Sequence, residues 1–164
     1  MDEARDVMAG FSWSEGMSVG VPALDADHRC IVRIINLLQD VEGEDARRVI
    51  ETVLDTLVVY CRYHFAREER VMAWCGFPGV GFHQEEHEGF AHVLTRLRQR
   101  YAAEGDSAIV GELRDYLTRW LCHHILIQDM AYKPYVLAPD GADVLMDETT
   151  QPRCDHVDRA AIAQ

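Results

Sequence analysis

The chain has 164 residues, which is enough for one domain with its own hydrophobic core and too few for two comfortable domains. Hydrophobic residues make up 48% of it and charged residues 27%, as is typical of a globular protein. The 28 acidic residues outnumber the 16 basic ones and give a net charge of −12. No basic stripe offsets this excess, so nucleic acid and anionic membrane surfaces are poor partners.

The absence of targeting signals predicts a cytoplasmic protein. The N-terminal segment has no cationic stretch followed by an apolar run, so no secretory signal is expected. No apolar run approaches the length needed to span a bilayer. The five cysteines are odd in number and show no CxxC spacing, which favours reduced thiols.

Apolar residues with helical spacing predict two helices in the first half of the chain. The first helix begins at Leu24, and its inward stripe advances in steps of four and three residues: Leu24, His28, Ile31, Ile35 and Leu38. The second is expected to begin near Glu44 or Asp45 and to end at Gly76 and Pro78. Its inward stripe contains Val49, Val53, Leu57, Tyr60, His64, Glu68 and Val71.

The same spacing predicts two further helices. The third begins near Phe82, and its stripe contains His83, His87, Phe90, Leu94, Leu97 and Tyr101. Residues 102–107 are expected to form a loop. The fourth helix places five residues on one side, and Pro134 discourages its continuation. These inward residues are Leu113, Leu117, Trp120, His124 and Ile127.

Four amphipathic helices joined by short loops predict an all-α fold, an antiparallel up-down-up-down four-helix bundle. Stripes in steps of four and three residues are the seams that such packing needs. We divide the chain into an N-terminal arm (1–23), the bundle (24–136) and a C-terminal extension or linker (137–164). The extension is mostly polar, with a short apolar patch at 144–146.

The histidines indicate where the chemistry lies. A single histidine on an apolar face is more often a satisfied core residue than a ligand, but here five of the eight lie on the inward stripes of all four helices. Burying them and a carboxylate without partners would cost several kcal/mol, whereas a metal centre satisfies them together. Two pairs have i,i+4 spacing, so each pair projects from one helix face. The predicted ligands are His28, His64, Glu68, His83, His87 and His124.

Asp129 is the open question in the predicted ligand set. It follows His124 by five residues, which places it about 140° around an ideal helix. On spacing alone, a surface acid and a ligand are equally supported. Coordination would require local unwinding of the helix or a carboxylate that reaches round from a flank. The remaining histidines, His92, His123 and His156, are expected at the surface.

The order and spacing of these blocks resemble a bacterial hemerythrin domain over roughly residues 11–136. The resembling blocks are Trp13, residues 18–28 (SVGVPALDADH), residues 64–69 (HFAREE), His83 with His87, residues 120–125 (WLCHHI), Asp129 and Tyr132. The resemblance implies two iron ions with a bridging oxide or hydroxide. It makes Asp129 a bridging ligand and prefers His124 to its neighbour His123.

The resemblance also implies how the site works. It assigns His83, His87 and His124 to a six-coordinate iron, and His28 and His64 to an iron with one open position. Dioxygen would bind there reversibly as hydroperoxide. Residues expected around the gas are Ile31, Phe65, Trp120, Leu121 and Ile125, for which plain core packing is an equally good explanation. Tyr132, one turn after Asp129, is a candidate hydrogen-bond donor to the ligands, although an ordinary tyrosine at a helix end is an equally good explanation.

The histidine-rich ligand set favours binding over catalysis, because oxygen-activating di-iron enzymes on similar bundles use four carboxylates and two histidines. We therefore expect no enzyme activity. Structural zinc is disfavoured because seven ligands exceed the four that it uses. Three roles remain: storage or delivery of dioxygen to an oxygen-consuming protein, oxygen or redox sensing through residues 138–164 or a signalling partner, and an enzyme that processes peroxide or nitric oxide.

Overall fold

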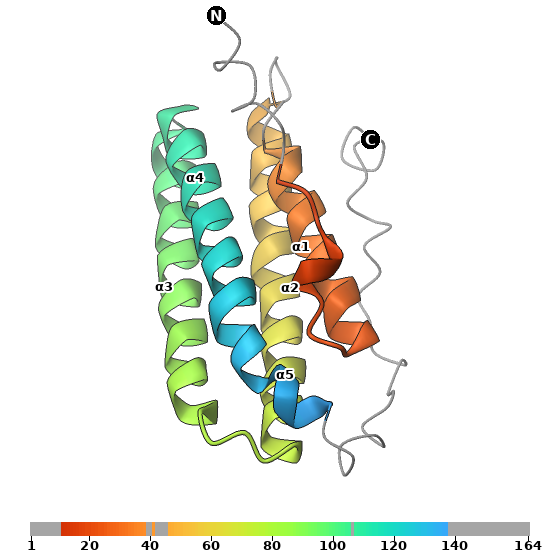
Figure 1. Cartoon of the computed structure of the whole chain (residues 1–164). Coiled ribbons are helices and arrows are strands. Elements are labelled where there is room, and N and C mark those ends of the chain that lie inside the picture. Colours follow the sequence, from red (N-terminus) through yellow and green to blue (C-terminus); the bar gives the residue numbers. More distant parts are fainter. Residues whose placement is uncertain (1–10, 39–40, 42–45, 106, 138–164) are drawn as a thin grey trace, which may run out of the picture.

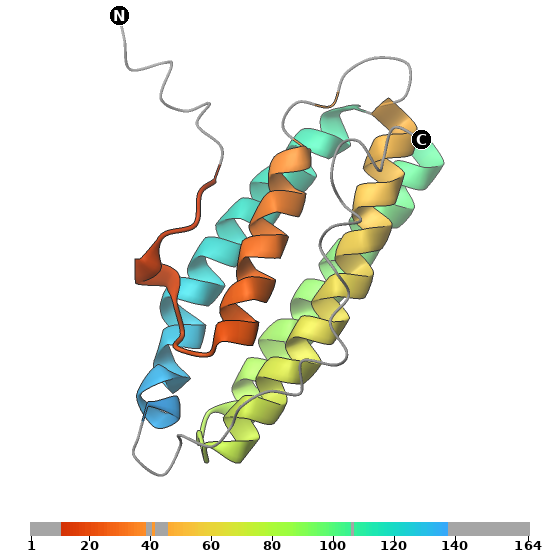
Figure 2. The same ribbon diagram turned by 90° about the vertical axis from the view of Figure 1, so that its right-hand side faces the viewer.

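A computed structural model of the chain describes residues 11–38, 41, 46–105 and 107–137. The regular structure of this part is entirely helical, and its long helices run alternately up and down (Figure 1). The view in Figure 2 shows the short arm before the first helix lying along the outside of the bundle. The predicted all-α four-helix bundle is confirmed. Its elements are η2 (Glu15–Met17), α1 (Pro22–Leu37), α2 (Ala46–Trp74), α3 (Val80–Glu104), α4 (Ser107–His123), η3 (His124–Asp129) and α5 (Met130–Val136).

Helix α1 begins two residues earlier than predicted, inside the expected arm. Pro22 opens the helix, where the missing N–H of proline has no cost because the first N–H groups of a helix have no partner within it. The arm is fastened to the first turn through Asp25. Its carboxylate accepts hydrogen bonds from the hydroxyl of Ser18 (2.6 Å) and the backbone N–H of Val19 (2.9 Å).

Helices α2 and α3 follow the predicted stripes, with shifted ends. Helix α2 begins at Ala46, and the expected start at 44–45 lies outside the described residues. Helix α3 begins at Val80 rather than near Phe82, and it continues to Glu104, through the first half of the expected loop. Gly105 then ends it in the left-handed conformation (φ 63°), which glycine adopts without a steric cost.

The last helix departs most from the prediction. Between His124 and Asp129 the backbone forms a π-helix, η3, whose turns are wider than those of an α-helix. Because each residue then advances by a smaller angle, the third residue after His124 does not return to the inward face. Ile127, predicted inward, is 56% exposed. Pro134 does not stop the helix, since α5 continues through it to Val136.

Two hydrophobic clusters fill the bundle at different levels. One includes Ile31, Phe65 and Ile125, and the other includes Leu24, Met72 and Tyr132. Along α1, α2 and the η3–α5 segment, three of the predicted ligands lie in sequence between residues of the two clusters: His28, Glu68 and Asp129. The polar centre is therefore bounded along the bundle by apolar packing on both sides.

Two further predictions concern the oxidation state of the cysteines and the presence of membrane-spanning helices. Cys61, Cys75 and Cys122 are free thiols, but Cys30 is disulfide-bonded, so the prediction of reduced thiols is wrong at this position. The spacing of cysteines along the chain gave no sign of this bond. None of the helices in the described residues is long and apolar enough to cross a membrane.

Candidate metal centre

Seven polar side chains converge in the middle of the bundle, and each is at most 2% exposed. They come from four different segments of the chain, so the centre exists only when the bundle is assembled. These are the seven residues that the sequence and the family resemblance singled out as ligands. They are His28 from α1, His64 and Glu68 from α2, His83 and His87 from α3, and His124 and Asp129 from η3.

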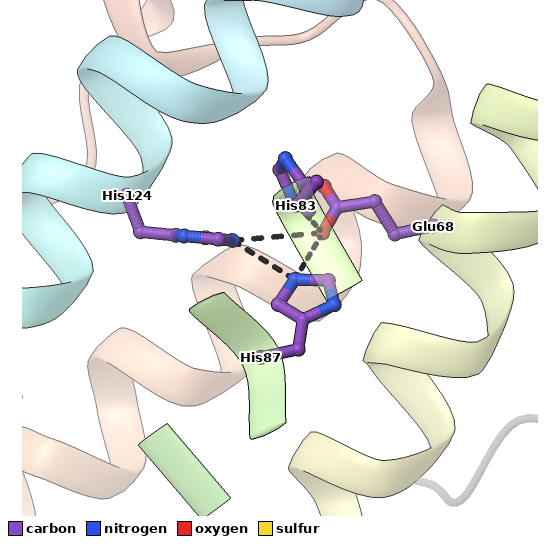
Figure 3. A group of neighbouring side chains, drawn as sticks. All are labelled: Glu68, His83, His87 and His124. Carbon is purple, nitrogen blue, oxygen red and sulfur yellow. Dashed lines mark hydrogen bonds and ion pairs between the residues drawn. The ribbon is translucent and has the colours of Figure 1, made fainter. Parts of the chain in front are cut away.

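The seven residues contain two overlapping groups that share the carboxylate of Glu68. The larger group joins Glu68 with three histidines, and Figure 3 shows their rings directed at its carboxylate from α3 and η3. Oε2 of Glu68 lies 3.3, 3.1 and 3.8 Å from the Nε2 atoms of His83, His87 and His124. The smaller group joins the same carboxylate with His28 and His64.

Asp129 is fully buried and lies close to both groups, so it is not a surface acid. Its Oδ2 lies 3.3 Å from Nε2 of His28, and its Oδ1 lies 3.2 Å from Nε2 of His124 and 3.4 Å from Nε2 of His83. The wide turn of η3 brings the fifth residue after His124 back to the inward face. Local widening of the helix, one of the two possibilities considered from sequence, is the one observed.

The distances between ring nitrogens fit ligands that share a metal ion. The Nε2 atoms of His28 and His64 are 3.1 Å apart, and those of His87 and His124 are 3.0 Å apart. Metal–nitrogen bonds of about 2.1 Å at right angles place two ligand atoms about 3 Å apart. Both carboxylate oxygens of Asp129 have no hydrogen-bond partner among the described residues, although they are buried. The donor atoms therefore fit metal ions better than they fit one another.

The pKa values of the two carboxylates also fit a site that binds cations. Burial raises the pKa of Glu68, but the charge of His64 and hydrogen bonds from His124, His83 and His87 outweigh it and hold this pKa well below its usual range. Burial and the nearby charge of Glu68 raise the pKa of Asp129 well above its usual range. Cations placed between these two acids would stabilise both in the ionised form.

The histidines differ in their electrostatic surroundings. Burial lowers the pKa values of His28 and His124, which favours neutral rings with a lone pair available for a metal. Burial also lowers the pKa of His83, but its hydrogen bond to Glu68 and the charge of Glu68 outweigh burial and raise it. A proton on His83 would therefore compete with a metal ion for the same nitrogen.

Several residues hold the ligands from behind. The hydroxyl of Tyr132 donates a hydrogen bond to Oε1 of Glu68 (2.7 Å), the role expected for it from sequence. Glu69, which was not among the predicted site residues, accepts a hydrogen bond from Nδ1 of His87 at 2.9 Å. Asp27 lies 3.5 Å from Nδ1 of His64 and was not predicted to act at the site. The only indication of this role in the sequence is that Asp27 is an acid directly before His28, at the edge of the buried face of α1.

The apolar residues expected around the gas are packed against the ligands. The ring of Phe65 stacks on His87 with centroids 3.8 Å apart, and Trp120 stacks on His124 at 4.2 Å. The other three, Ile31, Leu121 and Ile125, are at most 2% exposed and belong to the same hydrophobic cluster. Their placement fits both a dry pocket and ordinary core packing. The surface histidines His92 and His123 are exposed as predicted, and His156 lies outside the described residues.

Replacing Tyr132 with phenylalanine is expected to destabilise the iron-free protein by about 1.5–3 kcal/mol, the usual cost of losing a hydrogen bond to a charged group. The hydroxyl of Tyr132 is buried and donates to the carboxylate of Glu68. Chemical denaturation measures the change. Tyr116→Phe is the matched control, because the Tyr116 hydroxyl makes no hydrogen bond that the described residues show. Equal stability of the two variants would contradict the assigned contact.

A four-helix bundle that gathers five histidines and two acids in its interior defines a helical metal-binding protein. The family model named Hemerythrin HHE cation binding domain matches residues 19–136. The chain belongs to the hemerythrin family.

Individual relatives support the same assignment. A bacteriohemerythrin of Stenotrophomonas maltophilia is 35% identical over 131 residues, which cover 80% of this chain and 84% of the relative. One of Pseudomonas aeruginosa is 34% identical and covers 76% and 80% of the two chains. Among solved structures, a crystal structure of a hemerythrin mutant superposes with a TM-score of 0.64 at 26% identity, covering 76% of this chain and 95% of the other. Membership of this family supports a di-iron, oxygen-binding protein.

Proposed function

We propose that the protein holds two iron ions and binds dioxygen reversibly, with His28, His64, Glu68, His83, His87, His124 and Asp129 as the iron ligands. One observation carries the proposal: two groups of buried ligand atoms overlap at Glu68, and Asp129 lies within 3.4 Å of histidines in both. Shared carboxylates are what two neighbouring cations need, because each carboxylate has two oxygens and can serve both.

The two groups are unequal, and this inequality supports binding of a small molecule. One group has three histidines and the other has two, so with both acids shared the second iron has one protein ligand fewer. Two ferrous ions, joined by an oxide or hydroxide, would supply the two electrons that dioxygen takes up. The residues of the chain would orient the ions and keep water away, as expected for a centre between two apolar clusters.

The composition of the ligand set supports carriage of dioxygen rather than catalysis. The centre has two acids and five histidines, whereas oxygen-activating enzymes on related bundles use four acids and two histidines. We propose storage or delivery of dioxygen in the cytoplasm, to an oxygen-consuming protein. The sensing alternative would act through residues 138–164, which lie outside the described residues, or through a signalling partner, and no observation on the site favours it.

Optical spectra of the reduced protein, taken before and after exposure to air, test the proposed function. Air should produce a stable oxygenated spectrum that disappears again under vacuum. Rapid conversion to a stable di-ferric form that changes the structure or the binding of a partner would favour sensing instead. Multiple turnovers of added peroxide would contradict the expectation that the protein is not an enzyme.

A further inference from the structure

A buried carboxylate outside the ligand set lies behind His64. Asp27, on α1, is 2% exposed, and three side chains of α2 surround its two oxygens. Oδ1 accepts a hydrogen bond from the hydroxyl of Tyr60 (2.9 Å), and Oδ2 accepts one from the guanidinium of Arg67 (2.6 Å). The Nδ1 atom of His64 is buried and makes no hydrogen bond with the described residues, and the same Oδ2 lies 3.5 Å from it.

The positions of these three residues on α2 make the arrangement specific. Tyr60 precedes His64 by four residues and Arg67 follows it by three, so all three share one face of the helix. Helix α2 therefore holds Asp27 through one residue before His64 and one residue after it. Asp27 cannot move along α2 without breaking the hydrogen bond to Tyr60 or the one to Arg67.

The contact also bears on which ring nitrogen of His64 carries the proton. An ionised carboxylate only accepts hydrogen bonds, so Asp27 offers an acceptor to a proton on Nδ1 of His64. The Nε2 atom then keeps its lone pair, and it is this atom that lies 3.1 Å from Nε2 of His28 at the centre. Carboxylates behind metal-binding histidines fix the ring in this way.

We propose that Asp27, locked by Tyr60 and Arg67, is a positioning residue that holds the proton of His64 on Nδ1 and aims its Nε2 at the iron with the open position. The inference rests on the proposed function in taking His64 as an iron ligand. The other group has its own support, because Glu69, held by Gln84, accepts from His87.

Two measurements on Asp27→Asn test the proposal. Asparagine has one oxygen and one NH₂ group in place of the two carboxylate oxygens of aspartate. Its NH₂ group would face the donor of either Tyr60 or Arg67, so one of the two hydrogen bonds that fix residue 27 would be lost. Competition with a ferrous chelator should show one of the two irons bound roughly 10–100-fold more weakly, as for other residues behind metal ligands. The other iron should be unaffected. Arg67→Gln and Tyr60→Phe should weaken the binding of the same iron by a smaller factor. These two variants keep the proposal testable if Asp27→Asn does not fold.

Long-range ¹H–¹⁵N NMR of the iron-free protein supplies a readout that does not depend on iron. At a pH above the usual pKa of histidine, His64 should be protonated on Nδ1 in the wild type and should lose this preference in Asp27→Asn. Asp55→Asn is the matched control, since Asp55 is an exposed acid of α2 that pairs with Arg98. It should change neither result.

The outcomes separate this proposal from the proposed function. A wild type that binds two irons, with an Asp27→Asn variant of equal affinity and unchanged His64 protonation, would overturn the positioning role alone. A wild type that fails to bind two irons would overturn the proposed function, while the NMR result would still decide whether Asp27 sets the proton of His64.

Discussion

Replacing Glu68 with glutamine is expected to abolish iron binding at both groups. The substitution keeps the size of the side chain but removes one of the two carboxylate charges that both groups share. Two ferrous ions would then have the single charge of Asp129 to balance them in a buried site, where an uncompensated charge is costly. Metal analysis after anaerobic loading should find iron well below one ion per chain, and the optical bands of the oxygenated protein should be absent.

Glu51→Gln is the control for the loss of one acid from α2. Glu51 pairs with Arg47 at the surface, far along the helix from the centre, and its replacement should leave iron content unchanged. A Glu68→Gln protein that folds and still loads two irons would show that the shared carboxylate is not a ligand.

Replacing His64 with alanine is expected to remove one iron and the oxygenated spectrum together. His64 is one of only two histidines in the smaller group, so its loss leaves that ion with His28 and the shared acids. The larger group keeps its three histidines and should retain metal. Metal analysis should therefore find an iron content that falls from two toward one. Spectra recorded in air should lack the bands that report dioxygen binding.

His92→Ala provides the comparison for loss of a histidine. His92 is an exposed residue of α3 that belongs to neither group of ligands, and its replacement should leave iron content and spectra as in the wild type. If His64→Ala retained two irons and the same charge-transfer bands, the ligand assignment would be wrong.

The fold was predictable because the helical spacing of the apolar residues identifies the buried face of each helix in the bundle. The stripe of α3, from His83 to Tyr101, is buried throughout, as steps of four and three residues predict. Helix ends were less predictable, since they depend on local backbone features. Pro22 starts α1 and Gly105 ends α3, and neither belongs to an apolar stripe.

The candidate site was predictable wherever its residues lie on regular α-helix. His64 with Glu68, and His83 with His87, lie on inward apolar stripes, and their i,i+4 spacing places each pair on one helix face. Asp129 does not, because α-helical geometry points it away from the centre and only the π-helical turn brings it back. The same turn explains why Ile127 was wrongly placed inward.

The residues behind the ligands were hidden from sequence for a different reason. Asp27 and Glu69 each stand next to a ligand in the chain, so their position on a helix wheel suggests a flank rather than the core. Their roles depend on contacts between helices: Asp27 of α1 reaches α2, and Glu69 of α2 reaches His87 of α3. Spacing within one helix carries no information on such contacts.

Anaerobic titration of the purified, iron-free protein with ferrous salt tests the central claim most directly. The account predicts that the chain takes up close to two iron ions, because two overlapping groups of ligand atoms share Glu68 in the middle of the bundle. Saturation at one ion per chain, or no stable uptake of iron, would contradict it.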